Sequence, residues 1–400
     1  MHYIILFLFF IVKALFPQYG FILMIPLLIL ILKNITTKFF IYFYLLFLLS
    51  VNDIYSIYLL ILFNFFLILN QSINKFSFSS KFGKIILLFL LLLSISLYNY
   101  NSLNDFLRFM IIFSSLGLVF IRNRNVKLND KNIYQVYIVT VLAQFIYGFL
   151  NSVSDFRGSI FVGTENIAIA VFYLLMLYSV FSEELSKRKK YIAVFMYLLF
   201  LLNTDSRTIL LVFFVIIFIG LRSISLKKNI LIFSAFSIIV FFQLNNYNKA
   251  FFEKFSRVST LLDNLSLVDY RTLGNVENLD VRAVLYIEAI KKVKEKPFFG
   301  TGVVNPSFFS DKGDKGISSY HSSIADILVT YGFFGLIIIT LMLFYILKNS
   351  GFPKDKFIFY SFIGIIILSI VQPIFFNIQA ISLLFFMIYI RKTSNLFKLH

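Results

Sequence analysis

Hydrophobic residues form long, continuous runs along the whole chain, and short polar connectors separate them. Most of these runs are long enough to cross, or nearly cross, a bilayer hydrocarbon core of ~30 Å. They do not alternate between apolar and polar residues, which argues against a transmembrane β-barrel. The sequence therefore predicts an all-α, polytopic integral membrane protein with about 12–14 transmembrane helices. The expected spans are residues 3–16, 18–32, 39–50, 54–70, 82–98, 105–121, 132–150, 164–182, 191–204, 206–221, 229–245, 328–347, 357–372 and 374–390.

One long polar interval, residues 246–327, interrupts this pattern and is predicted to be a large extramembrane loop. Its second half contains an expected amphipathic helix, with Asp280 as N-cap, apolar residues at helical spacing, and lysines near its end. Pro297 is expected to stop this helix. The predicted parts of the chain are N-terminal transmembrane helices (1–150), central transmembrane helices with arginine-bearing outer loops (151–245), the large loop (246–327), and C-terminal transmembrane helices with a cytoplasmic tail (328–400).

Lysine and arginine are concentrated in alternate connectors. More than half of the 37 basic residues fall in every second connector, and the connectors between them are nearly free of basic residues. By the positive-inside rule, both termini are cytoplasmic and the large loop is extracytoplasmic. The formal net charge of +18 is thus a topology signal that also favours anionic lipid. It gives no reason to expect a nucleic-acid partner.

Composition supports the membrane interpretation and narrows the chemistry. Hydrophobic residues make up 60% of the chain and charged residues 14%, whereas a soluble domain has about 45–50% and about 25%. The chain has no cysteine, which excludes disulfides, thiolate metal sites and cysteine nucleophiles. With one interior histidine as well, a transition-metal site is not expected. We expect neither a metal nor a cofactor.

His321 is the only histidine away from a chain end, and it lies where the chain re-enters the membrane. A histidine at that boundary can take or give a proton near neutral pH. The alternative is a solvated histidine at the membrane interface. Upstream, Gly300 and Gly302 can form a tight turn with exposed N–H groups, a candidate anion nest. The alternative for these glycines is an ordinary turn after a helix.

Arginines near the outer ends of expected spans are the second candidate feature. A charge at such a boundary is costly and usually faces a cavity or a partner. The planar guanidinium donates paired hydrogen bonds and suits a diphosphate. The alternative for each arginine is local pairing with a nearby aspartate. The four candidates are Arg108, Arg157, Arg207 and Arg282.

Glu165 and Asn166 begin an expected span on the same side of the membrane. Either side chain can bind sugar hydroxyls or take part in proton transfer. The alternative for Glu165 is an acid favoured by the dipole of a helix N-terminus.

The order of these features resembles the O-antigen ligase and O-antigen polymerase superfamily of bacterial envelope glycosyltransferases. The resemblance covers residues 150–350, where each motif is degenerate and their order gives the specificity. The matching motifs are Gly163–Ala170, Asp205-Ser206-Arg207, Arg282 with its helix, Lys296-Pro297, Gly300-Thr301-Gly302, Tyr320-His321-Ser322-Ser323, and Tyr331–Gly335.

The resemblance implies a metal-independent, inverting transfer of a glycan from an undecaprenyl-diphosphate donor at the outer face of the bacterial cytoplasmic (inner) membrane. It implies that His321 and Arg207 are catalytic, with the histidine acting on the acceptor hydroxyl. Arginines would stabilise the departing diphosphate. Residues expected to bind the diphosphate or the glycan are Arg157, Arg282, Glu165, Asn166 and Tyr320.

Ligases typically show His-Asn where this chain has His321-Ser322. That departure favours a polymerase, which joins lipid-linked oligosaccharide repeat units into O-antigen, capsule or exopolysaccharide. The alternatives are a ligase that transfers the polysaccharide to lipid A core, a flippase or transporter of the lipid-linked oligosaccharide, and a structural membrane subunit. Expected partners are the undecaprenyl-diphosphate-linked oligosaccharide, the lipid bilayer, and a chain-length regulator and flippase of the same pathway.

Overall fold

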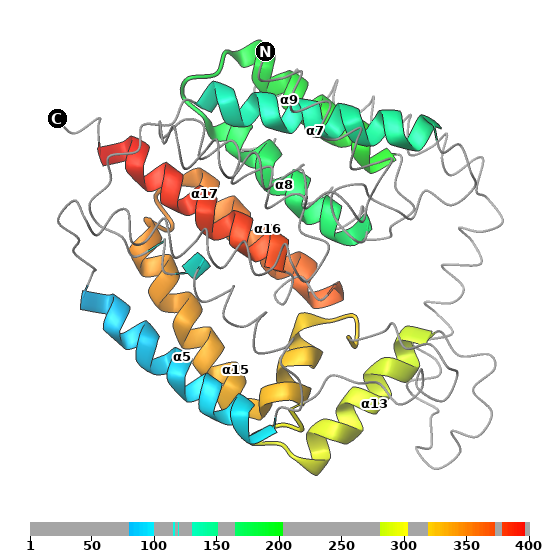
Figure 1. The fold of residues 1–400 in the computed structure, drawn as a ribbon, viewed down its shortest axis with the longest axis vertical. Coiled ribbons are helices and arrows are strands. Elements are labelled where there is room, and N and C mark those ends of the chain that lie inside the picture. The colour runs from blue at the N-terminus through cyan, green and yellow to red at the C-terminus, as the bar shows by residue number, and fades with distance from the viewer. Residues whose placement is uncertain are drawn as a thin grey trace, which may run out of the picture.

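The computed structural model describes residues 80–99, 115, 116, 119, 130–150, 165–202, 281–302, 319–372 and 378–396. Every regular element in these ranges is a helix (Figure 1). The spans expected before residue 80, at 105–121, and between 206 and 245 lie outside the described residues, apart from isolated positions. The helices are α5 (Ser80–Asn99), α7 (Asp130–Leu150), α8 (Glu165–Phe181), α9 (Lys187–Leu202), α13 (Val281–Glu295), α15 (Ser323–Ser350), α16 (Lys356–Val371) and α17 (Ile378–Leu396).

Most described helices coincide with predicted elements. Helices α5, α7, α8, α9 and α16 match expected spans to within a few residues at each end. Helix α13 confirms the amphipathic helix expected before Pro297. The boundary of the span predicted at 328–347 was wrong: α15 begins at Ser323, and its backbone is broken at Gly332. The polar residues Ser323 and Asp326 hid this earlier start, because they lie in the first turn of the helix.

Helix α8 forms the centre of the main core. It packs against α7, α9, α16 and α17, and its side chains from Ala168 to Tyr178 are buried. Tyrosine hydroxyls join neighbouring helices here: Tyr173 donates to the Tyr360 carbonyl at 2.9 Å, and Tyr197 donates to the Ile169 carbonyl at 3.0 Å. Such bonds between helices satisfy polar groups that a hydrocarbon environment leaves without water.

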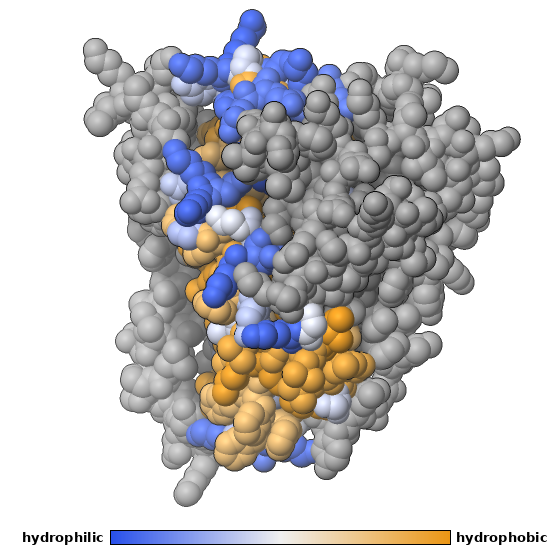
Figure 2. Space-filling model, turned by 90° about the vertical axis from the view of Figure 1, so that its left-hand side faces the viewer, coloured by the Kyte–Doolittle hydropathy of each residue, from blue (hydrophilic) through white to orange (hydrophobic). Residues whose placement is uncertain are grey.

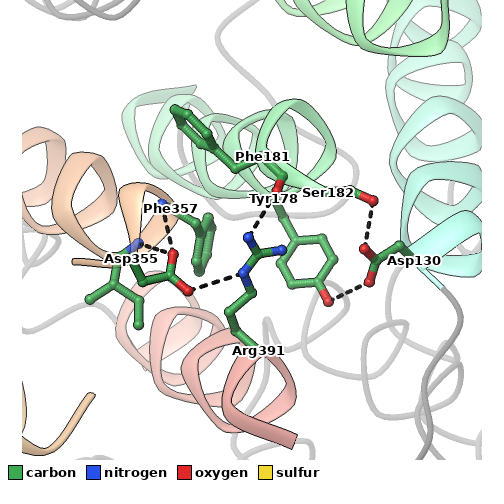
Figure 3. Close-up of polar contacts among 8 residues, drawn as sticks. Asp130, Tyr178, Phe181, Ser182, Asp355, Phe357 and Arg391 are labelled. Carbon is green, nitrogen blue, oxygen red and sulfur yellow. Dashed lines mark hydrogen bonds and ion pairs between the residues drawn. The ribbon is translucent and has the colours of Figure 1, made fainter. Parts of the chain in front are cut away.

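A polar network ties together the ends of four helices of this core (Figure 3). Arg391 of α17 forms an ion pair with Asp355, the N-cap of α16, at 3.1 Å. The same guanidinium donates to the Phe181 carbonyl at the end of α8, at 2.9 Å. Beside it, Asp130 at the start of α7 accepts from the hydroxyls of Tyr178 and Ser182. The network therefore fixes the ends of α7, α8, α16 and α17 in one layer.

These joined ends carry basic residues of predicted cytoplasmic connectors. Lys131 is the second residue of α7, Lys356 begins α16, and Arg391 lies near the end of α17. The network gathers these basic helix ends in one place. The sidedness expected from the charge pattern stays a prediction.

Among the described residues, α15 is the one helix long and apolar enough, by length and composition, to cross a membrane. Four shorter apolar stretches accompany it: Gly83–Ile95, Ile167–Phe181, Lys356–Ile370 and Ala380–Arg391. Figure 2 shows a broad hydrophobic area low on one face of the molecule. Exposed apolar side chains of α5 and α15 include Leu87, Leu90, Phe333, Ile337 and Phe344. An exposed apolar surface of this kind is compatible with a membrane protein.

Candidate functional site

The candidate site is built around the break in α15. Gly332 has φ 65° and ψ −165°, a conformation open essentially to glycine alone. It divides the helix into a short first half, Ser323–Tyr331, and a long second half, Phe333–Ser350. In Figure 1 the two halves run in different directions from the break. A break leaves carbonyls at the end of the first half and N–H groups at the start of the second half without helical partners.

The segment Pro297–Gly302, which follows α13, supplies those partners. Thr301 donates its N–H to the Val329 carbonyl at 2.7 Å, and Gly302 donates to the Thr330 carbonyl at 3.1 Å. In the other direction, the N–H groups of Phe333 and Phe334 donate to the carbonyls of Pro297 and Phe298, at 2.8 and 3.1 Å. The break is thus closed by four backbone hydrogen bonds to one segment, and we call this arrangement the helix-break junction.

Two glycines allow the junction to form. A Cβ on Gly332 would overlap the backbone of Phe298, and a Cβ on Gly300 would overlap the backbone of Thr330. Both glycines also have positive φ, 72° at Gly300 and 65° at Gly332. Any larger residue at either position would therefore push the two backbones apart as well as strain its own.

The anion nest proposed for this segment is wrong. Gly300 donates its N–H to the Lys296 carbonyl at 3.0 Å, and the N–H groups of Thr301 and Gly302 go to α15. These donors are therefore directed at protein carbonyls. The alternative expectation, a turn that follows a helix, describes the segment better.

His321 lies immediately before the first half of α15, in a turn with an unusual backbone. Its φ is 56°, the one positive value at a non-glycine residue in the described chain. Ser322 is the N-cap of α15, and its hydroxyl accepts from the Ala325 N–H at 3.5 Å. Ser323 donates to the carbonyl of Gln372, the C-cap of α16, at 3.0 Å. The turn is therefore fixed to the end of α16 as well as to its own helix.

Asp326 organises this turn from inside the protein. Its side chain is 2% exposed and accepts the Tyr320 N–H at 2.8 Å and the Ser319 hydroxyl at 2.7 Å. Ser319 in turn accepts the His321 N–H at 3.0 Å. Sequence reasoning missed Asp326 because it placed the start of the span at residue 328. The signal that could have found it is an acid among apolar residues at the mouth of a span.

Helix α13 and the first half of α15 lie side by side. Leu285 and Ala289 of α13 form a buried cluster with Tyr320 and Val329. The C-terminal ends of both helices meet at the helix-break junction, so their N-termini point to the same side of it (Figure 1). Arg282 lies in the first turn of α13 and His321 directly precedes α15. The fold therefore directs the N-terminal ends that bear Arg282 and His321 to one side of the molecule.

Tyr320 lies at the contact between these helices and is completely buried. The Lys292 ammonium lies 5.7 Å from the centre of its ring. Burial, together with the negative charges of Glu288 and Asp326, raises the pKa of the Tyr320 phenol well above its usual range. The phenol therefore stays protonated at neutral pH. Its expected contact with substrate stays a prediction.

The other expected site residues are placed only in part. Glu165 and Asn166 begin α8. Helix α8 runs antiparallel to α16, since Tyr178 packs edge-on against Phe357 at the start of α16, whereas the earlier residue Tyr173 lies against Gly364 farther along α16. The start of α8 thus lies toward the end of α16 that Ser323 contacts. Arg108, Arg157 and Arg207 lie outside the described residues, so their roles stay predictions.

Comparison with known families adds one decisive observation. Residues 192–340 match the family model described as O-antigen ligase. This segment is similar to the O-antigen ligase family. The O-antigen ligase segment contains α13, the helix-break junction and the first half of α15, and it includes Arg207, Arg282, Tyr320 and His321. No curated protein matches the chain.

The match confirms the resemblance to the O-antigen polymerase and ligase superfamily. Members of this family are enzymes that act on polysaccharides, so the match supports an O-antigen polymerase or ligase. It gives no support to the flippase. The family and the apolar helix together indicate a membrane protein. Arg157, Glu165 and Asn166 lie before the matched O-antigen ligase segment.

Proposed function

We propose that the protein is a polymerase that joins undecaprenyl-diphosphate-linked oligosaccharide repeat units at the outer face of the bacterial cytoplasmic membrane. One observation carries this proposal: within the O-antigen ligase segment, His321 is held in a fixed turn with φ 56°. Unfavourable backbone conformations persist where the surroundings impose them, and they cluster at active sites. We therefore assign the role of the base to His321, the only interior histidine of the chain.

In the proposed reaction, His321 takes the proton from an acceptor hydroxyl on one lipid-linked unit. The hydroxyl oxygen attacks the anomeric carbon of a second unit, and the bond from that carbon to the diphosphate breaks with inversion. Arg207 and Arg282, with Arg157, stabilise the negative charge that develops on the departing diphosphate. Glu165 and Asn166 contact the glycan. The products are a longer lipid-linked glycan and undecaprenyl diphosphate.

The position of Arg282 supports a shared anionic site with His321. Helix N-termini favour negative charge, and the N-termini of α13 and of the first half of α15 point to the same side of the helix-break junction. The basic connectors gathered around Arg391 support cytoplasmic termini and an extracytoplasmic position for the large loop. On this topology His321 faces the compartment where flipped lipid-linked sugars are found.

The second candidate is a ligase of the same superfamily, and the description of the matching family favours it. The residue after the histidine favours the polymerase, because ligases typically carry asparagine there. Ser322 is a helix N-cap in this protein, a position that serine and asparagine fill about equally well. The difference at residue 322 therefore marks a branch of the superfamily and does not require a different reaction.

A reconstituted assay tests the proposed function. The purified protein in lipid nanodiscs is given lipid-linked repeat units extracted from a host strain that lacks this gene. Polymerase activity gives a ladder of longer glycans, and His321→Ala gives none. Absence of chain growth with the wild-type protein would refute the polymerase. In the host, loss of a polymerase leaves single repeat units on the lipid A core, whereas loss of a ligase leaves none.

A further inference from the structure

We propose that Asp326 is the positioning residue for His321, and that it acts through Ser319 and the backbone of the turn. This inference rests on the proposed function of His321 as the base. Asp326 lies outside the expected set of histidine and arginines, and in this proposal it determines the position of the His321 imidazole.

A chain of hydrogen bonds connects the Asp326 carboxylate to the backbone of His321. Asp326 accepts from the Ser319 hydroxyl at 2.7 Å, and the same hydroxyl oxygen accepts from the His321 N–H at 3.0 Å. The second carboxylate oxygen accepts from the Tyr320 N–H at 2.8 Å. One carboxylate thus fixes the three residues that enter the helix, and the last of them is the histidine.

These hydrogen bonds hold the backbone of His321 in an unusual conformation. A φ of 56° at His321 is uncommon for a residue with a side chain. The turn keeps this conformation only while its other contacts outweigh the strain. On the far side of the histidine, the cap made by Ser322 and the bond from Ser323 to Gln372 fix the helix start. Asp326 fixes the residues that precede the histidine, Ser319 and Tyr320.

The hydrogen-bond chain depends on residue 326 having a carboxylate side chain. Both carboxylate oxygens act as acceptors, toward an N–H and a hydroxyl. Asparagine has the same shape but offers only one acceptor oxygen. Its amide NH₂ would meet the Ser319 oxygen as a second donor, and the Ser319 hydroxyl would lose its acceptor. Asp326→Asn therefore breaks the chain at one atom while keeping the volume of the side chain.

The decisive measurement follows His321 directly. The chain has three histidines, so protein with ¹³C-labelled imidazoles gives three resonances, and His321→Ala assigns one of them. In Asp326→Asn we expect the His321 resonance to move and broaden, with those of His2 and His400 unchanged. Asp355→Asn is the matched control. It makes the same chemical change at a partly buried carboxylate that accepts from the Phe357 and Ile358 N–H groups at another helix start.

The activity measurement separates positioning from simple damage. A displacement of about 1 Å in a catalytic group costs on the order of 100-fold in rate. We expect Asp326→Asn to lower kcat by about that factor, with KM for the lipid-linked unit changed by no more than about 3-fold. Asp355→Asn should lower the amount of folded protein but keep kcat per folded molecule.

Ser319 provides a second variant that leaves the buried carboxylate in place. Ser319→Ala removes only the hydroxyl that links Asp326 to the His321 N–H, and it should move the same resonance and lower kcat. Ser319→Thr keeps the hydroxyl and should restore both. This pair keeps the test valid if Asp326→Asn does not fold.

The outcomes are distinct. A His321 resonance that stays in place in both Asp326→Asn and Ser319→Ala overturns the positioning role, whatever the activity shows. A displaced resonance with unchanged kcat overturns it as well, because the reaction then does not depend on that position. Retained activity in His321→Ala refutes the proposed function instead, and the resonances alone then decide whether Asp326 holds the turn.

Discussion

Gly332 and Phe298 touch through their backbones at the break in α15. The Phe298 carbonyl accepts the Phe334 N–H at 3.1 Å, and the space that a Cβ of residue 332 would need is filled by Phe298 itself. Residues 34 positions apart in sequence are thus in backbone contact, and the helix before the break takes its direction from a segment outside it.

Gly332→Ala should destabilise the protein by about 3 kcal/mol, because a Cβ would overlap the backbone of Phe298 and strain a conformation suited to glycine. Denaturant unfolding in detergent micelles measures this. Gly83→Ala in α5 is the matched control, since nothing lies within 4 Å of the added methyl group. The control should be neutral or stabilising by up to about 1 kcal/mol. Equal stability of both variants would contradict the junction.

His321→Ala and Arg207→Ala should each abolish chain growth in the nanodisc assay while leaving the amount of folded protein unchanged. The reason is that His321 is proposed to take the proton of the acceptor hydroxyl, and Arg207 to stabilise the departing diphosphate. Gel filtration of the purified variants checks folding. Wild-type product ladders from both variants would refute the proposed site.

Tyr320→Phe should keep stability, because the ring fills the cluster with Leu285, Ala289 and Val329, and it should lower activity, because it removes the phenol expected to contact substrate. Tyr320→Ala should cost about 3–5 kcal/mol through the cavity that it leaves. The comparison separates packing from substrate contact. A Phe variant that folds normally yet loses activity would show that the phenol itself takes part in the reaction.

Ser322→Asn should keep the unfolding free energy within about 0.5 kcal/mol and keep the same product, because both residues cap a helix well. Ser322→Ala should lose about 1 kcal/mol with the loss of the cap. Product size on a gel and denaturant unfolding are the two measurements. Transfer of glycan to lipid A core by the Asn variant would show that this position selects the reaction.

Arg391→Met should destabilise the protein by about 2–3 kcal/mol, because it removes the charged donor to one oxygen of Asp355 and to the Phe181 carbonyl. Asp355→Asn added to Arg391→Met should cost less than the two single changes together, with a coupling of about 1–2 kcal/mol. A double-mutant cycle measures the coupling. Strict additivity would mean that the pair contributes nothing to holding the helix ends together.

The sequence predicted the helices well where burial or lipid surrounds them on all sides. Long apolar runs have no other stable form in a bilayer, so α5, α8 and α16 follow from composition alone. Helix α13 also followed from its spacing and from Pro297. Asp280, its expected N-cap, lies outside the described residues.

The site was predictable only in part. His321 stood out because it is chemically unusual in this chain, and the family match covers it. The break at Gly332 could not be predicted, since a glycine between Tyr331 and Phe333 looks like any small residue in an apolar run. Its effect depends on Pro297–Gly302, which local periodicity does not connect to it. Asp326 was missed for a similar reason: its partners Ser319 and Tyr320 precede the helix that carries it.

The helix-break junction and the turn that Asp326 holds before α15 together determine where the chain can change in length. Gly302 is bound to Thr330, and Ser319 is bound to Asp326, so the stretch from 303 to 318 starts and finishes on the same short helix. Lengthening or shortening a connection between two fixed points costs little free energy. A change of length between these two anchored points can therefore leave the histidine in its place.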